Sequence, residues 1–251
     1  MTERQWRPYT DLAWTEPIIT SPEDYAEETG RFAELIKKNS AIEVKSLLHL
    51  GCGAGVNDWT FKRHFRVTGV DISPEMLRLA RKLNPGVRYL KGDVRDFELG
   101  EKFDAVAVPE SIVHLRTEEE VRRTVANAVG HLNPGGVLLV GTYVREDYRE
   151  NNFVYTGSRD GIEVTVFENN HPAGETCETT VVYLIRRGEK LEVHHDSFTG
   201  GLFPLETWRG FFREAGLETG EEKLEGAYDR FLAGEGEYLL RLFIGRRPRR
   251  T

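Results

Sequence analysis

The segment from Val44 to Asp71 constrains the fold of this chain most, because it joins two apolar runs through a glycine-rich link. The apolar run 44–50 is typical of a strand that is buried on both faces of a parallel sheet. Three alternate glycines follow it, namely Gly51, Gly53 and Gly55. Glycine lacks a Cβ atom and tolerates positive φ angles, so it permits a tight turn that a ligand can approach closely. The segment therefore predicts a strand, a turn, a short helix and a second strand, with a ligand at the turn.

The second apolar run ends at Asp71, which lies 20 residues after Gly51. An acid at this distance accepts hydrogen bonds from two ribose hydroxyls in nucleotide-binding βαβ units. A surface turn followed by a helix-capping carboxylate is the alternative interpretation. A dinucleotide fingerprint would need glycine at position 56, where the chain has Val56. The pattern is G-x-G-x-G, which weighs against an oxidoreductase with a dinucleotide cofactor.

The stretches L-H-L-G-C-G-A-G and V-T-G-V-D-I-S-P-E-M-L closely resemble the class I S-adenosylmethionine-dependent methyltransferases. The resemblance implies an α/β fold with a Rossmann-like, doubly wound, seven-stranded sheet whose last strand is antiparallel. It also implies S-adenosyl-L-methionine as the cofactor, with its methionine part on the glycine loop. Asp71 would then hold the ribose, and Ile72 would lie against the adenine. One departure is His49, because the family usually has Asp or Glu at that position.

Further cofactor contacts are implied after the third expected strand, 87–90, where Asp93 and Val94 follow. In the family, an acid here accepts from the adenine amino group and the next backbone N–H donates to a ring nitrogen. A turn is the alternative role for Asp93. Related enzymes also carry an N-terminal segment that closes over the cofactor, which makes Tyr9 and Trp14 candidates for a lid. Packing of these rings against the sheet edge is the alternative.

The loop after the fourth expected strand, 103–108, contains the candidates for chemistry. Ligands of doubly wound sheets bind beyond the carboxyl ends of the strands, so Pro109 should border the cofactor. Glu110 could attract a cationic substrate, and His114 could take a proton from an amine acceptor. An exposed loop carboxylate and a structural histidine are the alternatives.

The same loop and the charge of the chain argue against a nucleic-acid substrate. The loop lacks the [Asp/Asn]-Pro-Pro-aromatic sequence of methyltransferases that modify exocyclic amines of nucleic-acid bases. The formal net charge is −7, whereas nucleic-acid surfaces normally carry a basic excess. We therefore expect a small-molecule partner.

We expect a single methyltransferase domain over residues 1–251, with an N-terminal lid segment and helix over 1–40 and an inserted antiparallel β substrate cap over 145–203. Similar insertions occur in methyltransferases acting on amino sugars, where they shape the substrate pocket and can build a homodimer. The insertion contains strand-like runs and a hairpin signal, at 162–167, 179–185, 191–198 and 187–190. The remaining expected elements are helices at 21–40, 73–83, 117–132 and 204–217, and strands at 137–144 and 238–244.

His194 and His195 of the insertion are candidate substrate contacts. Neighbouring residues of a strand point to opposite faces, so the two imidazoles do not readily ligate one ion. No second cluster has the spacing of metal ligands, and no metal site is predicted. One of the two histidines could still face the substrate pocket.

The N-terminal sequence has no apolar core like that of a signal peptide, and no run reaches the length of a membrane span. These features predict a cytoplasmic protein without a membrane partner. The sequence as a whole predicts an S-adenosylmethionine-dependent methyltransferase (EC 2.1.1) that acts on a small molecule, with nitrogen as the favoured acceptor. An O- or C-methyltransferase and a non-catalytic S-adenosylmethionine-binding regulatory protein are the alternatives.

Overall fold

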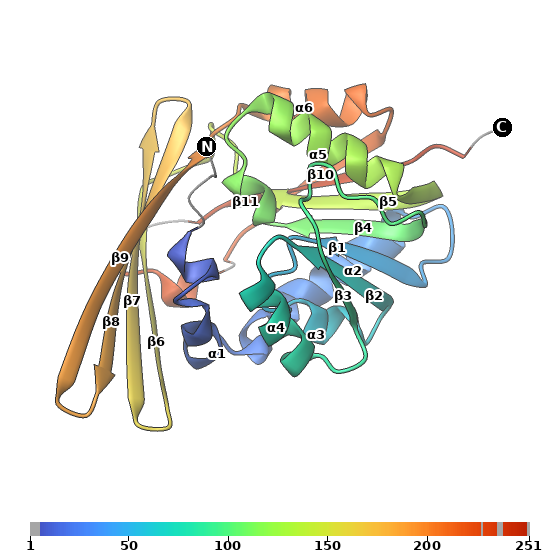
Figure 1. Ribbon diagram of the computed structural model, residues 1–251. Helices are drawn as coiled ribbons and strands as arrows, with labels where there is room; N and C mark the ends of the chain where they lie inside the picture. The colour runs from blue at the N-terminus through green and yellow to red at the C-terminus, as the bar shows by residue number, and fades with distance from the viewer. Residues whose placement is uncertain (1–5, 227, 235–237, 250–251) are drawn as a thin grey trace.

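The computed structural model describes residues 6–226, 228–234 and 238–249, which form two β-sheets with flanking helices (Figure 1). The larger sheet has seven strands in the order β10-β11-β5-β4-β1-β2-β3. Strand β11 is antiparallel to both of its neighbours, as expected for the last strand, whereas β1 to β5 are parallel. The strands are β1 Ser46–Leu50, β2 Arg66–Asp71, β3 Arg88–Lys91, β4 Phe103–Pro109, β5 Leu132–Thr142, β10 Glu218–Leu224 and β11 Leu240–Arg246. This arrangement confirms the expected fold class.

Two details of the larger sheet differ from the expectation. Strand β10 was not expected, because Glu218–Leu224 lies at the sheet edge and has mostly polar, exposed side chains without apolar alternation. Strand β5 begins at Leu132 rather than at the expected residue 137, and the segment 133–136 is an irregular part of that strand. The β4–β5 register shifts there, between Phe103 and Ala105.

The helices begin where the sequence offers caps. The Ser73 hydroxyl accepts a hydrogen bond from the Met76 N–H at 3.1 Å, at the start of α4. Thr117 and Glu120 form the expected capping box of α5. The helix expected from residue 21 is divided into a 3-10 turn, η3, and helix α2. The longer helices are α2 Ala26–Asn39, α4 Pro74–Leu83, α5 Glu118–Gly130 and α6 Leu205–Glu214; the short ones are η1 Arg7–Tyr9, η2 Ala13–Thr15, α1 Glu16–Ile19, η3 Pro22–Tyr25, α3 Asp58–Phe61, η4 Ser111–His114 and η5 Asp229–Phe231.

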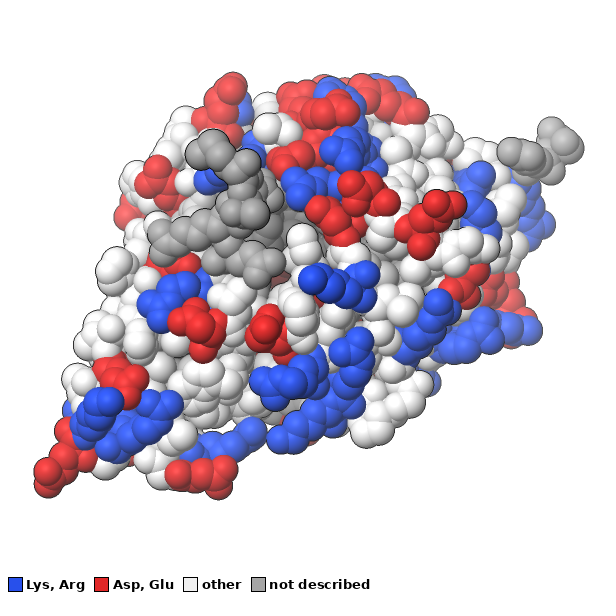
Figure 2. Space-filling model, in the orientation of Figure 1, with Lys and Arg blue, Asp and Glu red and all other residues white. Residues whose placement is uncertain are grey.

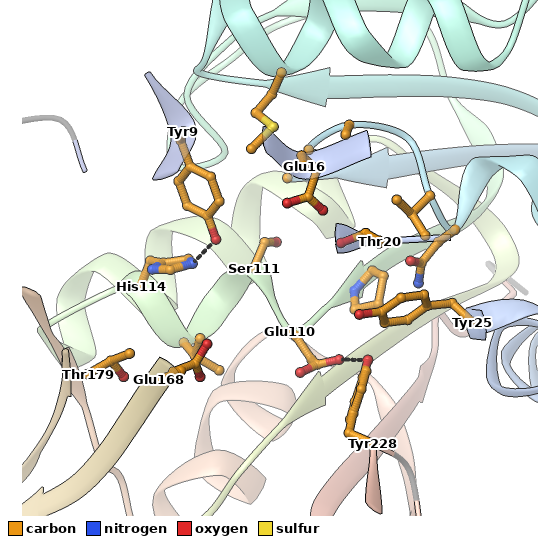
Figure 3. Close-up of a pocket in the computed structure, with 18 of the residues that line it drawn as sticks. Tyr9, Glu16, Thr20, Tyr25, Glu110, Ser111, His114, Glu168, Thr179 and Tyr228 are labelled. Carbon is orange, nitrogen blue, oxygen red and sulfur yellow. Dashed lines mark hydrogen bonds between the residues drawn. The ribbon is translucent and has the colours of Figure 1, made fainter. Parts of the chain in front are cut away.

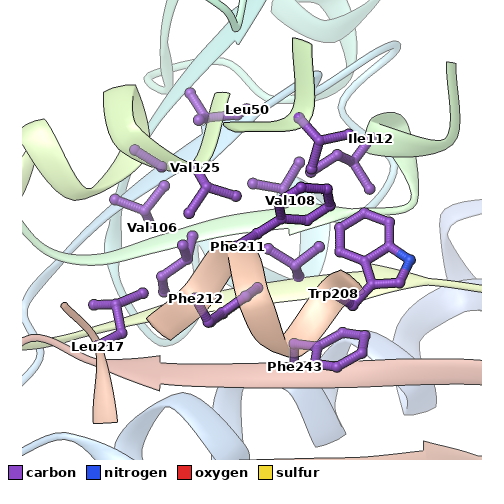
Figure 4. Close-up of a cluster of buried hydrophobic side chains, with 14 of the residues drawn as sticks. Leu50, Val106, Val108, Ile112, Val125, Trp208, Phe211, Phe212, Leu217 and Phe243 are labelled. Atoms are coloured by element: carbon purple, nitrogen blue, oxygen red, sulfur yellow. The ribbon is translucent and has the colours of Figure 1, made fainter. Parts of the chain in front are cut away.

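Helices α5 and α6 pack side by side on one face of the large sheet, and α2 packs on the other (Figure 1). The apolar face of α6 packs on the large sheet through Trp208, Phe211 and Phe212, all nearly inaccessible to solvent (Figure 4). The Trp208 ring stacks on Phe243 of β11 with centroids 5.7 Å apart. Each such ring buries roughly 150–250 Å², so α6 holds the antiparallel end of the sheet in place.

Acidic and basic side chains intermix on the outer surface of α5 and α6 (Figure 2). Arg122 of α5 pairs with Glu118 one turn earlier and with Glu214 of α6. Exposed ion pairs of this kind contribute little to stability, but they place opposite charges next to each other where the two helices meet.

The smaller sheet comprises the four antiparallel strands β6 Asn151–Arg159, β7 Ile162–Ala173, β8 Thr176–Arg187 and β9 Lys190–Gly201. It stands at one end of the larger sheet, and the N-terminal segment with α1 lies between the two (Figure 1). The expected strand-like runs all lie within β7, β8 and β9, and the expected hairpin joins β8 to β9. Strand β6 was not expected, because its Asn, Gly and Ser residues are typical of a loop. Among the described residues, no helix is long and apolar enough to cross a membrane.

Candidate active site

A cavity of about 310 Å³ lies at the carboxyl ends of β1 and β4, facing the smaller sheet (Figure 3). It is lined by the glycine loop, the N-terminal segment, the loop after β4 and the inner face of the smaller sheet. The sequence-predicted residues on its wall are Tyr9, Gly51, Gly53, Pro109, Glu110 and His114.

The glycine loop has the conformation that its sequence predicted. Gly51 has φ +67°, and a Cβ atom there would lie 2.2 Å from the side chain of Ser111. Gly53 has φ +51° and no neighbouring atom within 4 Å of the position that a Cβ would take. Gly55 also has a positive φ. The open side of Gly53 therefore leaves the backbone accessible to a ligand, as a nucleotide-type cofactor requires.

Asp71 lies at the end of β2 and holds the glycine loop directly. Its two carboxylate oxygens accept hydrogen bonds from the backbone N–H groups of Gly53 and Ser73, each at 2.8 Å. Burial raises the pKa of this carboxyl group, and the two backbone donors oppose that effect. The next residue, Ile72, has a side chain that is 49% exposed, which leaves it free to cover a flat ring.

Asp93 and Val94 lie outside the cavity wall. The Asp93 carboxylate accepts hydrogen bonds from Nε and Nη2 of the Arg95 guanidinium, the shortest at 2.9 and 2.7 Å, and this pairing lowers the pKa of Asp93. The same guanidinium also contacts Glu120 at the start of α5. An adenine amino group would therefore share the Asp93 carboxylate with Arg95.

The structure brings Tyr9 to the site and separates Trp14 from it. The Tyr9 hydroxyl is 2.9 Å from Nε2 of His114, and the Tyr9 carbonyl accepts from the Ser73 hydroxyl at 2.6 Å. Trp14 packs instead toward the smaller sheet, where the Arg187 guanidinium lies 4.9 Å from its ring centre. Of the two expected lid residues, Tyr9 lies on the cavity wall, and Trp14 has the alternative packing role.

His114 is held as a neutral imidazole. Burial lowers its pKa from 6.5 to about 4. Trp6 and Phe198 pack against the ring, with centroids 5.6 and 4.6 Å away. A group with so low a pKa is a weak proton acceptor from an amine, but its Nε2 can exchange a hydrogen bond with Tyr9 or a substrate.

Three carboxyl groups face the cavity from different elements (Figure 3). Glu110 follows β4 in a left-handed conformation, φ +61°, and accepts hydrogen bonds from the hydroxyls of Tyr228 and Tyr238. Glu16 begins α1, and Glu168 lies on β7. Burial raises the pKa of all three carboxyl groups above the ordinary value.

Glu16 and Glu168 were missed by sequence reasoning. The position of Glu168 could have been predicted from the alternation of β7. Val164 and Val166 are buried core residues, and alternation with a period of two places Glu168 on the same face of the strand. No sequence pattern predicted the position of Glu16, since the direction of its side chain depends on how the N-terminal segment packs.

His194 and His195, the candidate substrate contacts of the insertion, do not line the cavity. As expected, their side chains point to opposite faces of β9, because they are consecutive residues of one strand. His194 lies beside Tyr183 of β8, and His195 lies beside Val182. Nδ1 of His194 lies 3.2 Å from the Arg7 guanidinium, whereas His195 is exposed. Both lie nearer the hairpin end of β9 than Phe198, which does line the cavity.

His49 is linked to a buried carboxylate that the sequence did not indicate. Its Nδ1 lies 2.7 Å from Oδ1 of Asp58, and Asp58 also accepts from the Tyr89 hydroxyl at 2.8 Å. The imidazole lines the cavity, while the carboxylate is fully buried behind it. The pair places a polar ring where the family usually has an acid.

Comparison with known proteins agrees with this geometry. Residues 47–136 match the model of a methyltransferase domain family. The chain is 33% identical over 208 residues to the dTDP-3-amino-3,4,6-trideoxy-alpha-D-glucopyranose N,N-dimethyltransferase of Streptomyces venezuelae, covering 81% of this chain and 86% of that protein. It is 31% identical to the dTDP-3-amino-3,6-dideoxy-alpha-D-glucopyranose N,N-dimethyltransferase of Streptomyces fradiae, covering 77% of this chain and 78% of that protein.

A similar solved structure is that of CalS10 with bound S-adenosylmethionine, an amino pentose methyltransferase from Micromonospora echinaspora. It has a TM-score of 0.74 and 27% sequence identity, and the match covers 98% of this chain and 100% of that one. The fold and the glycine loop thus define a methyltransferase. More particularly, the chain belongs to the S-adenosylmethionine-dependent methyltransferases. It is an enzyme whose cofactor is S-adenosylmethionine, and it methylates a small molecule with nitrogen as the favoured acceptor.

Proposed function

We propose that this enzyme methylates an amino group on a sugar-sized molecule. The observation that carries the proposal is that Glu16, Glu110 and Glu168 face the cavity from three sides next to the glycine loop. Carboxylates attract ammonium groups and hold them by charge-assisted hydrogen bonds. The relatives from Streptomyces venezuelae and Streptomyces fradiae are named as methyltransferases of amino sugars, which supports the same acceptor class.

In this proposal, the cofactor-binding residues are Gly51, Gly53, Gly55, Asp71, Ile72, Asp93, Val94, Pro109 and Tyr9. Bound S-adenosylmethionine supplies a methyl group on a positively charged sulfur. The loop fixes its position, and Asp71 accepts the ribose hydroxyls beside the two backbone donors that it already binds. The open side of Gly53 provides the room that this arrangement requires.

The chain's contribution to the transfer is to orient an uncharged amine, because an in-line displacement depends mainly on proximity and alignment. His114 and Tyr9 present a neutral hydrogen-bonding pair at one side of the cavity. The cavity carboxyl groups are better proton acceptors than His114, since burial raises their pKa and lowers that of the imidazole. We therefore assign orientation to His114 and proton acceptance to the carboxylates.

The test is incubation of the purified protein with methyl-labelled S-adenosylmethionine and matched amino and hydroxyl sugars. We expect label on nitrogen, with no transfer to the hydroxyl analogues. Label on oxygen or carbon would show that nitrogen is not the acceptor atom and would contradict the proposal. Binding of the cofactor without transfer to any acceptor would instead indicate a regulatory protein.

The outer face of the smaller sheet supports a proposal that the enzyme is a homodimer. Phe167, Leu191 and Val193 are 47%, 46% and 59% exposed on the smaller sheet. Large apolar side chains grouped on one face commonly mark a protein interface. Light scattering should give twice the chain mass, and a Val193→Lys variant should shift the protein toward the monomer.

We also propose that the enzyme works in the cytoplasm. Its two cysteines, Cys52 and Cys177, are free and buried, and Cys52 lines the cavity. A reducing compartment keeps such thiols unmodified. Fractionation of the producing cells with activity measured in each fraction tests the proposal.

A further inference from the structure

Three hydrogen-bonded side chains connect the cavity with a carboxyl group outside it. Glu110 lines the cavity, and its carboxylate accepts a hydrogen bond from the Tyr228 hydroxyl (Figure 3). The same hydroxyl oxygen lies 3.1 Å from Oε1 of Glu28 on helix α2. Glu28 does not belong to the cavity lining and is only half-buried, so water reaches it from outside the cavity. The Tyr228 phenol therefore bridges a cavity carboxyl group and a solvent-accessible one.

This bridge requires a proton on one of the two carboxyl groups. A phenol has one hydrogen, so Tyr228 donates to one carboxyl oxygen at a time. The other carboxyl group can hydrogen-bond to the phenol oxygen only if it carries a proton and donates it. Glu28 and Glu110 are therefore not both ionised while Tyr228 bridges them.

The surroundings allow the bridging carboxyl groups to gain and lose a proton near neutral pH. Burial and the neighbouring Glu110 raise the pKa of Glu28 to about 8, and burial raises that of Glu110 as well. Carboxyl groups with such values exchange protons readily in this range. The other titratable groups that face the two are Arg230, Glu168, Tyr25, Tyr155 and Tyr238. Burial raises the pKa of these three phenols, so they stay neutral.

The backbone holds Glu110 and Tyr228 in strained conformations. Among the described residues, the non-glycine residues with a positive φ are Glu110 at +61°, Tyr228 at +67° and Asp160. Such conformations persist only where the surrounding structure fixes them, and they cluster at functional sites. The rings of Tyr25 and Tyr238 pack on that of Tyr228, with centroids 5.5 Å away in both cases. The phenol is thus fixed between the two carboxyl groups.

The other two cavity carboxyl groups have different neighbours. Glu168 accepts from the Asn170 amide at 2.8 Å, and an amide group does not pass on a proton. Glu16 interacts with the Thr20 hydroxyl, which lies on the cavity wall itself. Within the part of the chain that the structure describes, neither contact leads to a titratable group outside the cavity. Glu110 is therefore the cavity carboxyl group from which a proton can leave through side chains.

We propose that Glu110, Tyr228 and Glu28 carry the proton released by amine methylation from the cavity to the solvent. An ammonium acceptor that ends as a methylammonium product loses one proton for each methyl group that it gains. The nitrogen keeps the electron pair of its N–H bond and uses it to bond the methyl carbon, and the electron pair of the broken carbon–sulfur bond stays with sulfur.

The proton passes from nitrogen to Glu110. Glu110 then donates it to the Tyr228 oxygen while the phenol hydrogen moves to Glu28, so the phenol is restored, and Glu28 releases its proton to water. Tyr228 and Glu28 thus act through Glu110. This inference rests on the proposed function and adds to it the way in which the proton leaves.

The experiment uses two variants of the connection, each with a matched control. Tyr228→Phe removes the bridging hydroxyl, whereas Tyr238→Phe removes the other phenol hydroxyl bonded to Glu110 and leaves the connection intact. Glu28→Gln leaves an amide that hydrogen-bonds but cannot accept a proton, and Glu27→Gln changes the exposed residue before it. Labelled methyl transfer from S-adenosylmethionine to a dTDP-linked 3-amino sugar and to its free form is measured between about pH 6.5 and 9.5.

We expect kcat at pH 7 to fall roughly tenfold or more in both Tyr228→Phe and Glu28→Gln. The loss should shrink as pH rises, because the acceptor then arrives uncharged and gives up no proton in the cavity. Tyr238→Phe and Glu27→Gln should keep the pH dependence of the parent, so that any loss in Tyr238→Phe measures its bond to Glu110 alone. If one of the two variants of the connection does not fold, the other decides.

Losses of equal size at every pH, or turnover like that of the parent in either variant of the connection, overturn the inference. Methylation of the amino sugars by the parent would still support the proposed function in those cases. Transfer to neither amino sugar would contradict the proposed function, and the inference with it.

Discussion

Glu110 shows how a single residue joins the strain of the backbone to the chemistry of the site. It occupies the left-handed region at φ +61°, which costs a non-glycine residue about 1–3 kcal/mol. The backbone N–H donates to the Gly141 carbonyl at 3.0 Å, and two phenol hydroxyls hold the carboxylate. These contacts offset the strain and direct the carboxylate into the cavity.

At Asp71 we predict that replacement by Ala weakens S-adenosylmethionine binding roughly 100- to 10,000-fold. Each hydrogen bond to a charged group contributes about 1.5–3 kcal/mol, and the proposed ribose contacts involve two of them. Asp71→Asn should lose less, because its amide oxygen can still accept from the Gly53 N–H. Calorimetric titration is the measurement, and Asp96→Ala, at an exposed carboxylate, is the control. Unchanged affinity in folded Asp71→Ala would remove this residue from the cofactor site.

At His114 we predict a loss of turnover that does not depend on pH between 6 and 9. With a pKa of about 4, the imidazole is neutral throughout this range, so His114→Ala removes an orienting hydrogen bond rather than a base. We expect kcat to fall roughly tenfold while cofactor affinity stays the same. Rate profiles of both proteins over this range are the measurement. A loss that shrinks steadily as pH rises would identify His114 as the base after all.

Among the elements, those with local signals were predictable and those placed by packing were not. The glycine loop, β2 and the capped starts of α4 and α5 depend on residues close in sequence. Strands β6 and β10 were not predicted, because they lie at exposed sheet edges and their many polar side chains do not show the apolar and polar alternation of a half-buried strand. The cavity role of Glu16 and the exclusion of His194 both follow from how distant segments meet, which no local pattern encodes.

The start of α4 links helix stability to the N-terminal segment, because the Ser73 hydroxyl accepts from Met76 and donates to the Tyr9 carbonyl. We predict that Ser73→Ala destabilises the protein by about 1 kcal/mol through the lost cap, and also speeds cofactor release. Thr117→Ala, at the cap of α5, should cost similar stability without changing release. Thermal unfolding and stopped-flow dissociation measure the two effects. Equal release rates in the two variants would show that Tyr9 does not restrain the cofactor.

At the scale of the whole molecule, the buried carboxyl groups set the pH dependence of stability. Burial raises the pKa of Glu28 from 4.5 to about 8, and it raises those of Glu16, Glu110 and Glu168 as well. The native state then binds more protons than the unfolded chain, so the free energy of unfolding falls as pH rises from 4.5 toward 8. His114 acts in the opposite direction, but only below its unfolded value of 6.5.

We therefore predict that the ligand-free enzyme melts at a lower temperature at pH 8.5 than at pH 6.5, a window in which the opposing contribution of His114 changes only slightly. Glu28→Gln should reduce this difference, because a neutral amide can still hydrogen-bond to the Tyr228 oxygen, which lies 3.1 Å from the Glu28 carboxyl group, without a charge to bury. Glu27→Gln changes the preceding, exposed position of α2 and controls for net charge. If Glu28→Gln and Glu27→Gln both melted like the parent across this window, proton binding by the buried carboxyl groups would not govern stability.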